Sequence, residues 1–179
     1  MQTTTPNLSY PIGHPTLPVQ PLPAEERVIL IKQIADLPAQ LTAAARNVGG
    51  ERLLLPYRPG GWTGRQVIHH LADSHINSYT RFRLALTEDR PTICPYDEAA
   101  WATLPDVDAT PITVSLALLE GLHTRWTNLL WHLTEEQWQR RFFHPGSQRD
   151  FTLDQALALY AWHGQHHLAH LNLLLKQGE

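Results

Sequence analysis

The stretch TLDQALALYAWHGQHHLAHLNLLLK, residues 152–176, decides the fold. Thr152 followed by Gln155 is a capping-box pattern, in which the threonine hydroxyl and the glutamine amide satisfy unpaired backbone groups at a helix start. At about 100° per residue, one narrow arc then collects a set of apolar and histidine side chains: Ala156, Tyr160, His163, His167, His170 and Leu174. We therefore predict a long helix that turns a histidine-bearing stripe towards the core.

The same periodicity predicts three more long helices. They are expected at residues 24–47, 63–88 and 112–133. Thr63 with Gln66 caps the second of these, and Thr134 with Gln137 opens a short additional helix. The segments 48–62, 89–111 and 142–151 carry prolines or glycines and are expected to be loops.

No segment has a sequence pattern that convincingly predicts a strand. The fold class expected is therefore all-α, a four-helix bundle in one domain spanning residues 1–179. Residues 1–23 hold six prolines, which favour an extended arm. Apolar residues in that arm, such as Leu8 and Tyr10, indicate that it wraps the body of the bundle.

Composition excludes several functional classes. The formal net charge is −3 and no basic patch is apparent, which argues against nucleic-acid binding. No apolar run is long enough for a membrane span, and no apolar signal region precedes Arg27, so we expect a cytoplasmic protein. Cys94 is the single cysteine and cannot form an internal disulfide.

Eleven histidines are the unusual feature of the composition. His163 and His167 stand four residues apart, so both rings leave the helix on one face and can converge on one ion. Several inward imidazoles on one stripe are hard to satisfy with backbone groups, and a metal removes that difficulty. Gly164 stands where a metalloprotease H-E-x-x-H motif would need glutamate, so that motif is absent.

A third ligand must come from another helix. His69 points away from the apolar arc of its helix and is expected in solvent. His70 and His75 lie at the edge and near the middle of that arc, and geometry alone does not choose between them. His123 faces inward and could be a ligand or support one, whereas His132 faces outward.

Five segments together resemble the YfiT-like branch of the DinB superfamily. They are NLSYPIG (7–13), PYRPGGWTGRQVIHHLADSHINSYTRFRLALTE (56–88), PYDEAAW (95–101), LLEGLHTRW (118–126) and YAWHGQHHLAHL (160–171). The resemblance implies a cytoplasmic, homodimeric four-helix bundle that acts as a metal-dependent hydrolase. It also implies one zinc or nickel ion per chain on three histidines. The first ligand precedes Leu-Ala-Asp, which is His70 here, and the others are the two histidines of W-H-x-x-x-H, which are His163 and His167.

Three neutral imidazoles leave a coordination position open, as in catalytic sites. The first function expected is a hydrolase that activates water against a small-molecule substrate. The resemblance also implies an S-transferase that moves a low-molecular-weight thiol of the bacillithiol type onto an electrophile. A third alternative is a non-enzymatic, metal-binding stress-response dimer.

The sequence does not identify the group that moves protons in such a site. The candidates are His123, His166, His170, Asp73 and Glu98. Of these, His123 and Asp73 are the residues most suited to support the ligands from behind. The substrate and the native metal are not predicted either.

Overall fold

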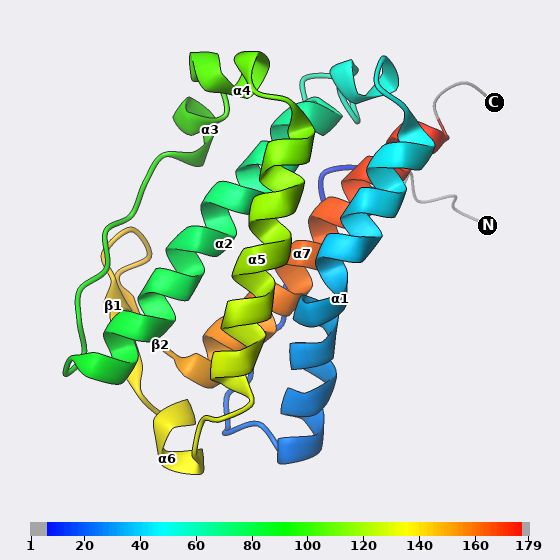
Figure 1. Ribbon diagram of the computed structural model, residues 1–179. Coiled ribbons are helices and arrows are strands. Elements are labelled where there is room, and N and C mark those ends of the chain that lie inside the picture. Colours follow the sequence, from blue (N-terminus) through cyan, green and yellow to red (C-terminus); the bar gives the residue numbers. More distant parts are fainter. Residues whose placement is uncertain (1–6, 177–179) are drawn as a thin grey trace, which may run out of the picture.

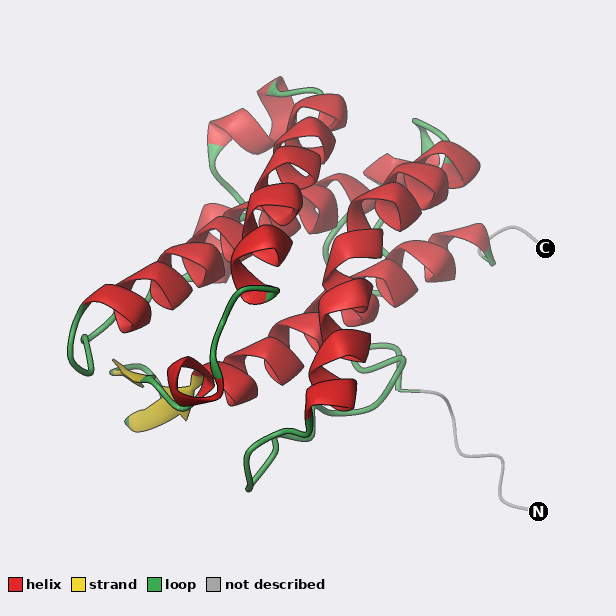
Figure 2. Cartoon of the chain, turned by 60° about the horizontal axis from the view of Figure 1, so that its bottom comes forward, coloured by secondary structure: helices red, strands yellow, loops and turns green. Residues whose placement is uncertain are grey.

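The computed structural model describes residues 7–176 and shows a bundle of four long helices (Figures 1 and 2). These are α1 (Ala24–Val48), α2 (Gly64–Thr87), α5 (Ile112–Leu130) and α7 (Leu153–Leu175). The prediction of an all-α bundle is confirmed, with helix ends within three residues of those expected. Residues 1–6, including Pro6 of the predicted arm, lie outside the described part.

Shorter elements connect the long helices. They are the 3-10 helix η1 (Arg52–Leu54) and the helices α3 (Glu98–Trp101), α4 (Pro105–Ala109) and α6 (Glu135–Trp138). After Thr87 the chain runs back along α2 to α3 and α4 (Figure 1). The segment 89–111, expected to be a plain loop, therefore contains two short helices.

Each long helix packs against two others. α1 contacts α5 and α7, and α2 contacts the same two helices, so α1 and α2 lie diagonally across the bundle. This arrangement brings α2 beside α7, and these two helices carry most of the histidines. None of the helices described has an apolar run long enough to cross a lipid bilayer.

All three predicted capping boxes are present. Thr63 with Gln66 opens α2, Thr134 with Gln137 opens α6, and the same pair of reciprocal bonds opens α7. In α7 the Thr152 hydroxyl accepts from the Gln155 backbone N–H at 3.2 Å, and the Thr152 N–H donates to the Gln155 amide oxygen at 3.3 Å. The local sequence therefore fixes where the histidine stripe begins.

The expectation of no strands was wrong at one place. Strands β1 (Arg141–His144) and β2 (Arg149–Thr152) form a small antiparallel hairpin. Phe142 and Phe151 face each other across it with ring centroids 5.7 Å apart. Each strand has only four residues, which is too short for an alternating pattern to be recognised in the sequence. The strands are defined by their pairing across the Pro-Gly turn.

The N-terminal arm lies along α7. The Gln155 amide donates to the Pro18 carbonyl at 3.0 Å, and the Trp162 indole N–H donates to the Gly13 carbonyl at 3.3 Å. At the end of the arm, the Leu22 N–H donates to the Asp154 carboxylate. The described part of the arm therefore wraps the bundle, as its apolar residues indicated.

The buried core is divided into two apolar clusters. One cluster includes Phe82, Trp126 and Tyr160, and the other includes Leu71, Leu119 and Leu171. On three helices a buried or half-buried histidine lies in sequence between members of the two clusters. We call these three residues the histidine layer: His75 of α2, His123 of α5 and His163 of α7.

Candidate metal centre

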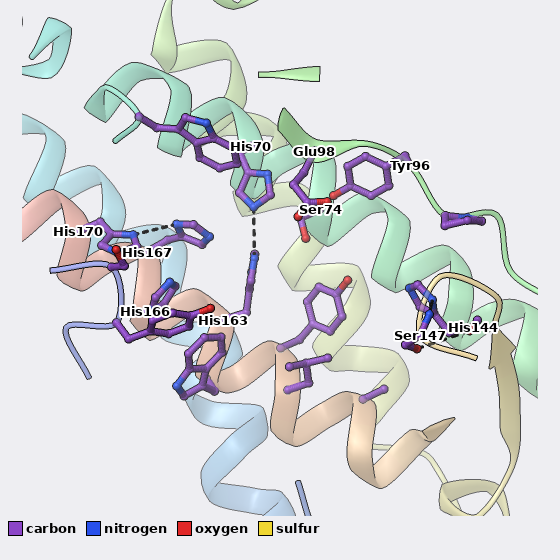
Figure 3. A pocket seen from close by; sticks show the side chains of 18 of the residues that line it. His70, Ser74, Tyr96, Glu98, His144, Ser147, His163, His166, His167 and His170 are labelled. Atoms are coloured by element: carbon purple, nitrogen blue, oxygen red, sulfur yellow. Dashed lines mark hydrogen bonds between the residues drawn. The ribbon is translucent and has the colours of Figure 1, made fainter. Parts of the chain in front are cut away.

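Three histidines from two helices meet between α2 and α7. One ring nitrogen of each of His70, His163 and His167 lies within 4.8 Å of the others. Figure 3 shows the rings of His70 and His163 facing each other across the gap between the helices. These are the three residues that the family resemblance implied as ligands.

Gly164 explains how α7 comes close enough to α1 behind this point. A Cβ atom at position 164 would collide with the side chain of Leu37 on α1. Glycine therefore serves helix packing where a metalloprotease motif would place a glutamate.

The histidine layer determines which nitrogen of His163 is free. The carbonyl of Ile34 can only accept, so His123 donates to it from Nδ1 over 2.6 Å. A neutral His123 then accepts at Nε2 from His75 Nδ1 over 2.8 Å. His75 in turn accepts at Nε2 from His163 Nδ1 over 3.2 Å. His163 is left with an unprotonated Nε2 that points towards His70.

The spacing of the facing nitrogens fits a metal. His70 Nε2 and His163 Nε2 lie 3.3 Å apart. Two nitrogens bound tetrahedrally at about 2 Å from one ion are separated by roughly the same distance. Three imidazole donors suit borderline cations such as zinc or nickel, and the hydrogen-bonded Nδ1 of His163 supplies the outer support that ligating histidines normally have.

Burial keeps these imidazoles neutral. It lowers the pKa of His70 to about 4, with a further contribution from nearby His166. Burial also lowers the pKa of His163 and His167 well below the ordinary value of 6.5, and the neighbouring imidazoles lower it further. A neutral imidazole has the lone pair that a metal requires, so the site is ready for a cation at neutral pH.

A second group of histidines adjoins the first and shares His167. Ring nitrogens of His166, His167 and His170 also lie within 4.8 Å of one another. His167 Nδ1 and His170 Nδ1 are 3.3 Å apart (Figure 3). His166 Nδ1 and His170 Nε2 are buried without a hydrogen-bond partner among the described residues. His166 and His170 were predicted as candidate proton carriers, and their grouping with His167 was not predicted.

A cavity of about 650 Å³ opens beside the histidines. Its floor is formed by α2 and α7, which contribute His70 and His163 among others. Its walls come from four segments outside the long helices: Tyr10 lies in the arm, Trp62 before α2, Tyr96 after α2 and His144 in the hairpin. Burial raises the pKa of the Tyr96 hydroxyl to about 12, so this group stays protonated at neutral pH.

His69, His123 and Asp73 lie outside the cavity. His69 was expected in solvent, which was wrong: it is buried, and its Nδ1 lies 2.8 Å from the Ser115 hydroxyl of α5. α5 covers the face of α2 that the helical wheel left to water. His123 supports His75 from behind and is not among the residues lining the cavity. Asp73 is half-buried and also does not line the cavity, so its supporting role stays a prediction.

Arg81 also lines the cavity and was not predicted as a site residue. Arg81 follows His70 by eleven positions, about three turns, so both residues share one face of α2. That spacing could have revealed it. No sequence signal points to His144 or Ser147, because they reach the cavity through the hairpin.

A bundle in which histidines of neighbouring helices converge defines a class of metal-binding helical protein. The chain belongs to the DinB superfamily, whose sequence profile matches residues 33–171. It is 48% identical over 174 residues, 97% of each chain, to the Bacillus subtilis strain 168 protein named "Putative metal-dependent hydrolase YfiT". A Bacillus cereus strain AH820 protein of the same description is 50% identical over 171 residues, 96% of this chain and 97% of its own.

The fold has a matching solved structure. Bacillus subtilis YfiT, described as having an unusual four-helix bundle topology, aligns with a TM-score of 0.92 at 48% identity. The alignment covers 96% of this chain and 97% of the other. The names of the relatives and the histidine cluster together support a metal-dependent enzyme at the coarse level.

Proposed function

We propose that this protein is a metal-dependent hydrolase that holds one zinc or nickel ion on His70, His163 and His167. The observation that carries the proposal is the 3.3 Å approach of His163 Nε2 to His70 Nε2 at the edge of a cavity, with His163 Nδ1 already engaged by His75. A cation bound there supplies Lewis acidity, which acidifies water and polarises a carbonyl group. The first of the two histidine groups is favoured because the histidine layer directs a lone pair into it.

The protein's own residues support hydrolysis in three ways. His75 accepts the Nδ1 proton of His163 and so holds that ring in its metal-binding tautomer. Trp62 lies against His70, with ring centroids 4.7 Å apart, and shields one side of the site. The proton acceptors among the cavity-lining residues are Glu98, His144, His166 and His170.

The test is a metal analysis joined to an activity screen. Freshly purified protein should contain about one transition-metal ion per chain. It should hydrolyse members of a panel of esters and amides without added thiol, and a chelator should abolish that turnover. Turnover seen only when a low-molecular-weight thiol and an electrophile are supplied would replace the hydrolase with a transferase. No turnover, with a chelator lowering only thermal stability, would indicate a structural ion.

The variant His163→Ala tests the ligand set directly. It should lower bound metal far below one ion per chain, because it removes the nitrogen that the histidine layer makes available. His132→Ala is the matched control, since His132 is exposed on the segment after α5 and should leave the metal content unchanged. A full metal complement in His163→Ala would contradict the site.

Location and assembly complete the proposal. We expect a cytoplasmic homodimer acting on a small-molecule substrate. Size-exclusion chromatography with light scattering checks the dimer.

A further inference from the structure

Arg81 is a buried cation without a buried anion. Its residue exposure is 8%, and it lines the cavity beside the histidines. Its guanidinium donates to the hydroxyl of Tyr160 at 3.2 Å. Within residues 7–176, no carboxylate forms a salt bridge with Arg81.

The other buried arginine, Arg27, does have carboxylate partners. Arg27 is 3% exposed and is bonded to the carboxylates of Asp154 and Glu135. Removing a charge from water is costly unless an opposite charge compensates it. The neutral hydroxyl of Tyr160 accepts from one of the five N–H donors of Arg81, but it does not compensate the positive charge. The remaining donors of Arg81 suit an oxyanion that enters the cavity.

The position of Arg81 relates it to the histidine group. It lies about 16 Å along α2 from His70 on the same helix face, and long side chains on a helix lean towards its N-terminus. The guanidinium therefore reaches back in the direction of His70. Tyr160, its hydrogen-bond partner, stands one turn before His163 on α7.

The charges and surfaces around the cavity favour an anion with an apolar body. Apart from histidines, the charged residues that line it are Arg58, Arg81 and the exposed Glu98. Burial lowers the pKa of His144, and the positive charge of Arg81 lowers it further. Aromatic residues, including Tyr10 and Trp162, make up half of the other residues that line the cavity.

We propose that Arg81 is an anion-binding residue and that the cavity takes small acids: an apolar body with a carboxylate or phosphate that docks on the Arg81 guanidinium. The inference names the substrate class of the proposed hydrolase and rests on that function for the reaction, while the binding itself needs no turnover.

Titration calorimetry with a matched set of probes tests the binding. The probes are phenylbutyrate, its uncharged amide phenylbutyramide, and phenylpropyl phosphate. An oxyanion on a buried guanidinium should bind about tenfold more tightly than the neutral amide. Comparison of the two anions identifies whether carboxylate or phosphate is preferred. Equal binding of the acid and the amide by the unmodified protein would overturn the proposal.

Variants assign any such preference to Arg81. Arg81→Met should bring the affinity ratio of acid to amide close to one, whereas Arg83→Met, at an exposed position two residues along α2, should retain the full ratio. Should Arg81→Met fail to fold by circular dichroism, Arg81→Lys keeps the charge, loses the two-pronged geometry and should lower the ratio partially. A full ratio in a folded Arg81→Met or Arg81→Lys protein would contradict the assignment.

One more variant separates this site from the metal site, because a metal also attracts anions. His163→Ala should retain the preference for the acid if Arg81 provides it. Loss of the preference in His163→Ala, with retention in Arg81→Met, would refute the anion site and leave the hydrolase intact. A preference for the acid, without hydrolysis of any ester or amide that carries a free acid group, would refute the hydrolase and leave the anion site intact.

Discussion

The backbone carbonyl of Ile34 controls the tautomer of His163 through two intervening histidines. The Ile34 oxygen fixes the tautomer of His123, His123 fixes His75, and His75 fixes His163. Each step follows because a neutral imidazole has one donor and one acceptor nitrogen. Two histidines that never touch the proposed metal therefore influence how firmly it binds.

Replacing His123 with phenylalanine should weaken metal binding. The change keeps an aromatic ring in the core but leaves His75 free to adopt the tautomer that competes with His163 for the donor role. Loss of such outer support typically reduces metal affinity about 10- to 100-fold. Competition with a colorimetric chelator measures the effect. His132→Phe, in the exposed turn after α5, should leave the affinity unchanged, and unchanged affinity in His123→Phe would refute the relay.

The roles of some of these residues could be predicted from the sequence, and those of others could not. The inward direction of His123 and of the pair His163 and His167 followed from helical periodicity, which depends only on local spacing. The choice between His70 and His75 did not follow, because both are buried on α2. Their roles differ in which neighbour each ring meets, and that depends on how α2 sits against α5 and α7.

Among the elements, the start of α7 is bonded to several other segments through one side chain. Asp154 in its first turn accepts hydrogen bonds from the arm at Leu22, from α1 at Arg27 and from Gln139 after α6. Asp154 is 1% exposed. One carboxylate therefore ties three segments to the helix that carries the histidine stripe.

The variant Asp154→Asn should destabilise the protein. It leaves Arg27 buried with only the exposed Glu135 as its partner, and breaking a buried ion pair on one side typically costs about 3–5 kcal/mol. Asp150→Asn is the control, because its pair with Arg90 is largely exposed and should contribute less than about 1 kcal/mol. Urea unfolding measures both. Equal effects of the two substitutions would show that burial of the pair is not decisive.

Elements were predictable where their signals are local. The capping boxes at Thr63, Thr134 and Thr152 mark helix starts because their bonds span only three residues. The hairpin could not be seen in the same way. Its register depends on Phe142 meeting Phe151, and on a third segment in which Ile93 bonds to Phe143.

At the scale of the whole molecule, a polar layer divides the core. The histidine layer lies between two apolar clusters; His75 and His123 are buried and His163 is half-buried, and the pKa of each is lowered, so all three are neutral. Burial lowers the pKa of His123 to about 4 although the Ile34 carbonyl partly opposes this, and burial lowers that of His70 to the same value. The core therefore resists protonation that an unfolded chain would accept.

This difference predicts how stability depends on pH. Between pH 6.5 and about pH 4, the unfolded chain binds protons at these histidines and the folded chain does not. The free energy of unfolding should therefore be highest above pH 6.5 and fall as the pH is lowered towards 4, by up to about 3 kcal/mol per histidine. Urea titrations in the presence of a chelator measure it. A stability that is flat from pH 7 to pH 4.5 would contradict the neutral state of His70 and His123 in the folded protein.

The division between floor and walls in the cavity has a consequence for how such proteins diversify. The proposed ligands are held by long helices, whereas the arm, the segments before and after α2 and the hairpin contribute surface residues such as Tyr10, Trp62, Tyr96 and His144. Loops tolerate insertion and replacement far better than packed helices do. Exchanging those segments between relatives should thus transfer substrate preference while the reactive chemistry stays the same, which makes them the natural units for grafting and directed evolution.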